Sequence, residues 1–413
     1  MMPPRMRRFV VRARRRLGVM LAEHNELARS RAFLRRQVPE GRDDARLRWD
    51  GATAEVEVAG RSFFLRSDFV QARPEICDFA LFALAAVSSR TNREIAVDFP
   101  VSRSAARRME QLEYAYTVWS LSSLAPPRLR LSQIVDPSPP APTGRRAICL
   151  SGGIDSTAAA IAARGRGYTH SVLIAGADYP NAAHPGFCEL QGRVRRLSEL
   201  LELEPVTVET DFRRMPLDWE LQHSFLLAAA LQFHAPAFDE ASWALDLTLM
   251  DEPVLHPWGN MSVLQALFST ETLPIVTLNP FETRRDKARM IAEFAPETGE
   301  GSGQGPGALI PHLSVCWVDQ STGGNCGRCF KCARTKLIFD TLGVDAGAMF
   351  ATPPDTDAVL ADTSVPGRMS KLRLQIALTT GLYFALPDGP VRRRLAQQAR
   401  QMQEKYVRAM PYR

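Results

Sequence analysis

The sequence lacks an apolar run long enough to cross a membrane. Its longest run, Phe79 to Val87, is far short of the roughly 20 residues that a spanning helix needs. The basic N-terminus also lacks the uninterrupted apolar stretch and small-residue cleavage site of a secretory signal. With 45% hydrophobic and 23% charged residues, the composition is typical of a globular protein. We therefore expect no membrane span and a cytoplasmic location.

Cysteine is also scarce, with seven residues in a chain of 413. Four of the seven lie in the window 316–332. A disulfide framework is typical of short secreted domains, whereas clustered cysteines in a long chain indicate metal binding. The cysteine pattern thus favours a metal site in a reducing compartment.

The net charge of +6 is concentrated at the N-terminus, where residues 1–48 contain fourteen arginines and five acids. Apolar residues at helical spacing predict a basic amphipathic helix over residues 5–36. A basic segment of this kind binds nucleic acid or an anionic surface in some proteins and is simply solvated in many others. Both interpretations stay open.

The length of the chain exceeds the ~250–300 residues that one hydrophobic core usually serves, which predicts more than one domain. Residues 136–144 contain four prolines and are incompatible with a helix or a central strand. We place the main domain boundary there. The expected organisation is a basic arm (1–45), a small α/β domain (46–135), a Pro-rich linker (136–144), a nucleotide-binding domain (145–345) and a helical tail (346–413).

Strand and helix patterns alternate after the linker, which predicts a parallel sheet covered by helices on both faces. Before the linker, alternating apolar residues around Ala59-Gly60 predict a β-hairpin, followed by two helices and short strands. The expected strands of the second domain cover residues 146–150, 171–175, 205–209, 242–247 and 275–278. The glycine-rich stretch 299–307 is expected to form a loop.

The segment Ser151-Gly152-Gly153-Ile154-Asp155-Ser156 follows the first of these strands and opens an alanine-rich helix. Two glycines allow a tight turn that exposes backbone N–H groups, and a helix N-terminus adds partial positive charge. The segment contains no lysine, so it is not the Gly-x4-Gly-Lys-Ser/Thr loop of common nucleoside triphosphatases. The alternative is an ordinary strand-to-helix turn without a ligand.

This segment resembles the loop of the PP-loop ATP pyrophosphatase superfamily. The resemblance implies that the loop holds the phosphates of ATP with Mg²⁺, and that a substrate oxygen attacks the α-phosphate to give an adenylate and pyrophosphate. These binding roles would fall to Ser151, Gly152, Gly153, Asp155 and Ser156. Asp155 would position Mg²⁺ or brace the loop.

The four clustered cysteines, Cys316, Cys326, Cys329 and Cys332, are separated by nine, two and two residues. Short cysteine spacings let backbone turns direct several thiolates at one tetrahedral Zn²⁺ ion. An iron–sulfur cluster, which also uses four thiolates, is the alternative. Four protein ligands leave no open position for water, so we expect the site to stabilise the fold rather than catalyse.

The loop and the cysteine cluster together resemble the 7-cyano-7-deazaguanine synthase family over residues 145–343. The resemblance implies a Rossmann-like parallel sheet of the adenine nucleotide alpha hydrolase type, with a zinc site and helices toward the C-terminus. Residues 46–135 have no counterpart in that family, and the segment from Gly176 to Pro180 differs from the family's sequence. The resemblance thus implies a class of reaction rather than a particular acceptor.

Charged residues elsewhere are further candidates for the site. Arg284 and Lys287 lie three apart at the start of a predicted helix and would share one face, where they would neutralise the leaving pyrophosphate. The alternative is a solvated face paired with Asp286 or Glu293. Asp178 and Asp246 follow the ends of predicted strands, where open α/β sheets bind ligands, although capping roles fit them equally.

Taken together, these patterns predict an ATP-dependent ligase that adenylates a carboxylate or amide and then transfers nitrogen to give an amide or a nitrile. ATP, Mg²⁺ and Zn²⁺ are the expected cofactors, and a small molecule is the expected acceptor. An RNA or protein acceptor is the alternative to a small molecule, and a tRNA-modifying enzyme of the same superfamily is one alternative function. A non-catalytic ATP-binding subunit is the other, and an oligomer is compatible with each of these functions.

Overall fold

The computed structural model describes most of the chain after the N-terminal segment. The described ranges are 36–70, 72–119, 123–138, 141–255, 257–296, 305–316, 324–356 and 369–409. Residues 1–35, which are most of the basic arm and all but the last residue of the predicted amphipathic helix, therefore lie outside the described residues, as does most of the predicted loop at 299–307.

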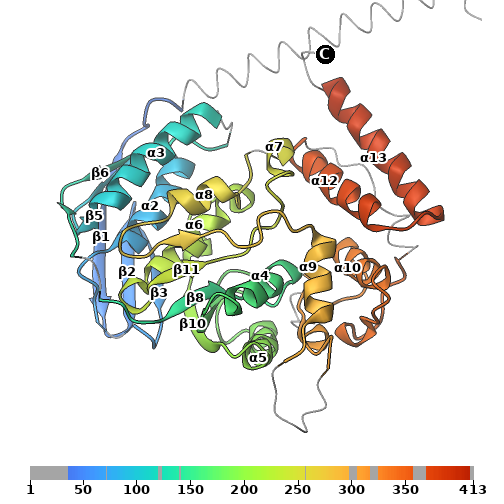
Figure 1. Ribbon diagram of the computed structural model, residues 1–413. Helices are drawn as coiled ribbons and strands as arrows, with labels where there is room; N and C mark the ends of the chain where they lie inside the picture. The colour runs from blue at the N-terminus through green and yellow to red at the C-terminus, as the bar shows by residue number, and fades with distance from the viewer. Residues whose placement is uncertain are drawn as a thin grey trace, which may run out of the picture.

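Ten strands form one mixed, mostly parallel sheet in the described part of the chain (Figure 1). The two pairs between β1, β2 and β3 are antiparallel, as is the pair of β3 with β10, and the remaining pairs are parallel. From edge to edge the strands are β12 (Ile275–Val276), β11 (Glu240–Ser242), β8 (Arg146–Cys149), β9 (His170–Ala175), β10 (Glu204–Thr210), β3 (Arg61–Arg66), β2 (Thr53–Val58), β1 (Arg42–Asp50), β4 (Glu94–Val97) and β6 (Leu129–Leu131).

The parallel half of the sheet is wound in both directions from β8. Strands β9 and β10 follow on one side of β8, and β11 and β12 follow on the other. The direction of winding reverses between β8 and β11. In sheets of this topology, ligands bind beyond the carboxyl ends of the strands at that reversal point. The segment from Ser151 to Ser156 begins directly beyond β8, so the topology brings it to this point.

Helices cover both faces of the parallel half, as predicted. Successive residues of β8 and the residue after it alternate between two hydrophobic cores: Ala147 and Cys149 belong to one, and Ile148 and Leu150 to the other. The second core contains apolar residues of α4 (Ile154–Arg164), α5 (Pro185–Leu200), α9 (Arg284–Glu293) and α10 (Phe330–Asp340). The first contains residues of α6 (Trp219–Gln232) and α8 (Ser262–Leu267).

The segment before residue 136 shares the first core. Its hairpin turns at Ala59 and Gly60, which both have positive φ angles as a tight turn requires. Helix α2 (Asp78–Thr91) packs on α6, and the rings of Phe79 and Phe233 lie 5.1 Å apart. Helix α3 (Arg103–Trp119) lies beside the two-stranded sheet of β5 (Val101–Ser102) and β7 (Ile134–Val135). The segments expected as two domains thus contribute to one sheet and one core.

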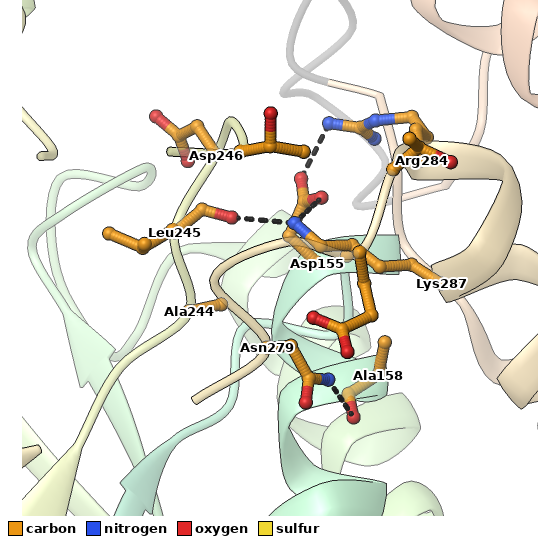
Figure 2. A network of polar contacts seen from close by, with 12 residues as sticks. Asp155, Ala158, Ala244, Leu245, Asp246, Asn279, Arg284 and Lys287 are labelled. Atoms are coloured by element: carbon orange, nitrogen blue, oxygen red, sulfur yellow. Dashed lines mark hydrogen bonds and ion pairs between the residues drawn. The ribbon is translucent and has the colours of Figure 1, made fainter. Parts of the chain in front are cut away.

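Two strand boundaries differ from the prediction by more than two residues. Strand β1 begins at Arg42, inside the segment assigned to the arm, because residues 42–45 pair with β4. The strand predicted at 242–247 is β11, which ends at Ser242. The residues after it turn away from the sheet and bring Leu245 and Asp246 toward the reversal point (Figure 2).

The C-terminal tail is mainly helical, as predicted. Helices α12 (Met369–Ala385) and α13 (Pro390–Ala409) pack on each other, and α12 also contacts α10 and the short helix α7 (Glu252–Leu255). Among the described residues, no helix combines the length and the apolar character that crossing a bilayer requires.

Gly176 follows β9 and packs closely against Thr210, the last residue of β10, and it provides a test of the fold. Its φ angle is +102°, and a Cβ atom would lie 1.8 Å from the carbonyl oxygen of Thr210. We expect Gly176→Ala to lower the free energy of unfolding by about 2–4 kcal/mol, since backbone strain and a steric clash add. Urea denaturation would measure the change.

Gly192 is the matched control, because it lies inside α5 and a Cβ atom at this position would have no neighbour within 4 Å. Gly192→Ala should raise stability by roughly 0.5–1 kcal/mol through its helix propensity. Equal effects of the two substitutions would contradict the packing of Gly176 against Thr210.

Candidate nucleotide-binding site and metal centre

The segment from Ser151 to Ser156 forms a closed turn between β8 and α4. Gly152 has a φ angle of +74°, a conformation that glycine adopts without strain. The Ser156 hydroxyl donates to the carbonyl oxygen of Gly153 at 3.1 Å and accepts from the backbone N–H of Ser151 at 3.3 Å. Gly153 is the N-cap of α4, and no side chain caps this helix. The first N–H groups of α4 are therefore available to an anion.

Asp155 lies in the first turn of α4 and pairs with both predicted cations of α9 (Figure 2). Arg284 donates to one carboxylate oxygen, and the Lys287 ammonium lies 3.1 Å from the other. Lys287 also donates to the carbonyl oxygen of Leu245 at 2.9 Å, and its side chain is only 3% exposed. The predicted pair is therefore part of a buried network rather than a solvated face.

The start of α9 is fixed by its own capping box. The Thr283 hydroxyl accepts from the backbone N–H of Asp286, and the Asp286 carboxylate accepts from the backbone N–H of Thr283. Asp286 is thus engaged with the cap and with Arg289, not with Arg284 or Lys287. The loop before α9 is also tied to α4, because the Asn279 amide donates to the carbonyl oxygen of Ala158 at 3.2 Å (Figure 2).

Helix α10 adds two cations that the sequence analysis missed, Lys331 and Arg334. Burial lowers the pKa of Lys331 below its ordinary value; the charge of Arg284 lowers it further, and the Asp155 carboxylate acts in the opposite direction. Burial and the charge of Arg284 likewise lower the pKa of Arg334 to about 9. Lys331 lies within the cysteine motif and Arg334 two residues after it. Their position beside the clustered cysteines is the signal in the sequence that points to them.

The two predicted acids lie at the same edge of the sheet in different surroundings. Asp178 follows β9 and is exposed, and its charge acts on both Lys331 and His223. Asp246 accepts from the indole N–H of Trp258 at 3.2 Å and lies 3.7 Å from the imidazole of His223. Burial alone would lower the pKa of His223. The hydrogen bond and charge of Asp246, together with the carbonyl oxygen of Trp219 and the charge of Asp178, outweigh burial and raise the pKa.

The four cysteines converge at one point, as their spacing predicts. Their sulfur atoms all lie within 4.8 Å of one another, and three pairs are 3.4–3.9 Å apart. Four sulfurs about 2.3 Å from a central Zn²⁺ ion would be ~3.8 Å apart, so the donor set fits a tetrahedral zinc site. The Asn325 amide orders the backbone here, since it accepts from Val315 and Cys316 and donates to Leu313 and Met349.

The cysteine cluster is joined to the loop from Ser151 to Ser156 by the segment that precedes Cys316. The backbone N–H of Ser314 donates to the carbonyl oxygen of Gly152 at 2.8 Å. A Cβ atom on Gly152 would touch the side chains of Val194 and Ser314 at 3.4 and 3.5 Å. The loop is therefore held between α5 and the segment that leads to the cluster.

Comparisons of the chain with protein-family models, with curated proteins and with solved structures find no match.

Zinc content provides the first test of this region. We expect the purified protein to contain about one zinc per chain, and Cys332→Ser to contain less than half of that amount, because a tetrahedral site requires all four thiolates. Inductively coupled plasma mass spectrometry measures the metal. Cys188→Ser is the control, since Cys188 is exposed and lies outside the cluster. Iron with inorganic sulfide, or full zinc content in Cys332→Ser, would contradict a four-thiolate zinc site.

The His223–Asp246 pair predicts a pH dependence of stability. The pKa of folded His223 lies above its unfolded value, so the pair contributes fully below about pH 6.5 and is lost as the pH rises through the folded pKa. The effect should be at most ~1 kcal/mol, because the Asp246 side chain is 44% exposed. Urea midpoints at pH 6 and pH 8 should show that Asp246→Asn loses more stability, relative to the wild type, at the lower pH. An equal loss at both values would exclude the pair as the cause.

Proposed function

We propose that this protein binds ATP at the loop from Ser151 to Ser156 and cleaves it between the α- and β-phosphates. The supporting observation is the position of Asp155 and its two cations. They lie at the uncapped N-terminus of α4, at the point of the sheet where the winding reverses. Topology, helix dipole and side-chain charge thus favour an anionic ligand at the same place.

The charges around the loop suit a polyphosphate better than a single carboxylate. The loop itself contains no lysine, and the cations come instead from α9, through Arg284 and Lys287, and from α10. Asp155 offsets one positive charge, so an excess of cationic charge remains next to the loop. Cations fixed where negative charge develops stabilise a leaving pyrophosphate without reorganisation during the reaction.

The proposed reaction has two steps. An oxygen of the acceptor carboxylate or amide attacks the α-phosphorus, the bond from that phosphorus to the bridging oxygen breaks, and pyrophosphate leaves. A nitrogen nucleophile then attacks the activated carbon and loses a proton, and AMP departs to leave an amide. From an activated amide, loss of AMP and a proton gives a nitrile. The resemblance to the 7-cyano-7-deazaguanine synthase family supports this nitrogen chemistry.

Mg²⁺ would neutralise phosphate charge when it is bound. It is usually held by one or two carboxylates together with phosphate oxygens. Asp178 and Asp246 are oxygen donors at this edge of the sheet, so the residues fit the ion. Asp155, whose two oxygens accept from Arg284 and Lys287, would brace the loop. Zn²⁺ would be held by the four cysteines and would stabilise the C-terminal part of the fold.

The direct test is product analysis. The protein is incubated with ATP, Mg²⁺, ammonia and a panel of small carboxylates that includes 7-carboxy-7-deazaguanine, and phosphorus NMR identifies the products. Acceptor-dependent AMP and pyrophosphate would support the proposal, whereas ADP would contradict it. ATP binding without AMP would direct the search to an RNA or protein acceptor, or to a non-catalytic ATP-binding subunit.

Arg284→Gln should lower the rate of AMP formation about 100-fold, as expected when one fixed donor to developing charge is lost. Arg289→Gln is the matched control on the same helix, because Arg289 pairs with Asp286 and its side chain is 41% exposed. The two rates are measured by the release of labelled pyrophosphate from ATP. A similar loss in both variants would mean that Arg284 acts through the stability of α9 rather than through the reaction.

A further inference from the structure

Helix α10 begins at the cysteine cluster and contains the cationic residues Lys331 and Arg334. Cys329 is its N-cap, and the Cys329 sulfur accepts from the backbone N–H of Cys332 at 3.4 Å. Lys331 lies between these two cysteines, and Arg334 follows it by three residues, which places both on one side of the helix. Helices α9 and α10 pack side by side (Figure 1), so the cations of both helices are brought together.

Arg334 is buried without an acceptor for its Nε–H group. The residue is only 4% exposed, and its Nε atom has no hydrogen-bond partner among the described residues. The guanidinium carbon lies 5.9 Å from the centroid of the Phe330 ring. A buried guanidinium without an anion is strongly disfavoured, whereas the same group is stable against a carboxylate or phosphate. The surroundings of Arg334 thus indicate an anionic ligand.

Charges at the starts of α4 and α9 act on both residues. Asp155 and Arg284 both act electrostatically on Lys331 and on Arg334. Asp155 is already engaged by Arg284 and Lys287, since each of its oxygens accepts from one of them. The carboxylate therefore cannot neutralise two further cations, and a ligand with several negative charges is required to do so.

We propose that Lys331 and Arg334 bind the β- and γ-phosphates of ATP and retain the pyrophosphate that leaves. This inference rests on the proposed function and extends it, because it gives the helix that begins at the cysteine cluster a direct role in phosphate binding. The cysteine cluster fixes where α10 begins, because Cys329 is the N-cap of this helix. The start of the helix in turn fixes where Lys331 and Arg334 lie along it.

A different role for the two cations has to be separated from this one. A zinc ion with four thiolates carries two net negative charges, and Cys329 acts electrostatically on Arg334. If the cations only balanced the cluster, their removal would release zinc and destabilise the fold. If they bind phosphate, their removal would leave zinc in place, and loss of an unpaired buried charge would not lower the melting temperature.

The experiment uses the full chain with its metal and titrates inorganic pyrophosphate, ATP with Mg²⁺, and AMP by calorimetry. Lys331→Met and Arg334→Met are compared with Lys336→Met, a control on the same helix that pairs with Asp340. We expect about a 10- to 100-fold weaker Kd for pyrophosphate and ATP in the first two variants, as for the loss of a charge-assisted hydrogen bond. The affinity for AMP, the zinc content and the control should not change.

Wild-type affinity for pyrophosphate in both variants would overturn the inference, as would loss of zinc together with a lower melting temperature. Lys331 is only partly buried, so Lys331→Met keeps the test informative if Arg334→Met does not fold. A wild-type protein that binds neither ATP nor pyrophosphate would instead refute the proposed function. Binding of ATP that depends on Arg284 but not on Lys331 or Arg334 would refute this inference alone.

Discussion

Asp155 joins two helices that are distant in the sequence, and the geometry of the site depends on this contact. Its carboxylate pairs with Arg284 and Lys287, so the first turn of α4 is fixed against the first turn of α9. Lys287 also reaches the carbonyl oxygen of Leu245, which follows β11. These contacts hold together α4, α9 and the segment after β11, which meet where the direction of strand winding reverses. Because the participants are mostly buried, loss of one partner would leave an uncompensated charge and would strongly disfavour this arrangement.

Local sequence patterns predicted the parts of this site that local chemistry determines. The turn from β8 into α4 depends on Gly152 and on the hydroxyl of Ser156, and both signals lie within the same short segment. The cysteine cluster could also be predicted, since Cys326, Cys329 and Cys332 are close in the sequence and need only one helix start and one turn. The hairpin at Ala59 was predictable for the same reason.

Features that depend on tertiary packing could not be predicted in the same way. Proline-rich residues 136–144 indicate a break in regular structure, but they do not reveal that β3 pairs with β10 across that break. Likewise, helical spacing shows that Arg284 and Lys287 share a face. It does not reveal their partner, Asp155, which lies 129 residues before Arg284 in the sequence. The cations of α10 were missed because a metal motif directs attention to its ligands and not to the residues beside them.

The cysteine cluster and the loop from Ser151 to Ser156 are parts of one structural unit. The backbone N–H of Ser314 donates to the carbonyl oxygen of Gly152 in the loop. Cys316, two residues later, is the first of the four clustered cysteines. From the cluster, α10 returns along α9 and brings Lys331 and Arg334 to the charges of Asp155 and Arg284. The path from Ser314 through the cluster and along α10 thus begins at the loop and returns to the charged residues beside it. A metal held by the four cysteines would fix the middle of this path, so a cluster without an open coordination position can still determine the distance between the loop and the cations of α10.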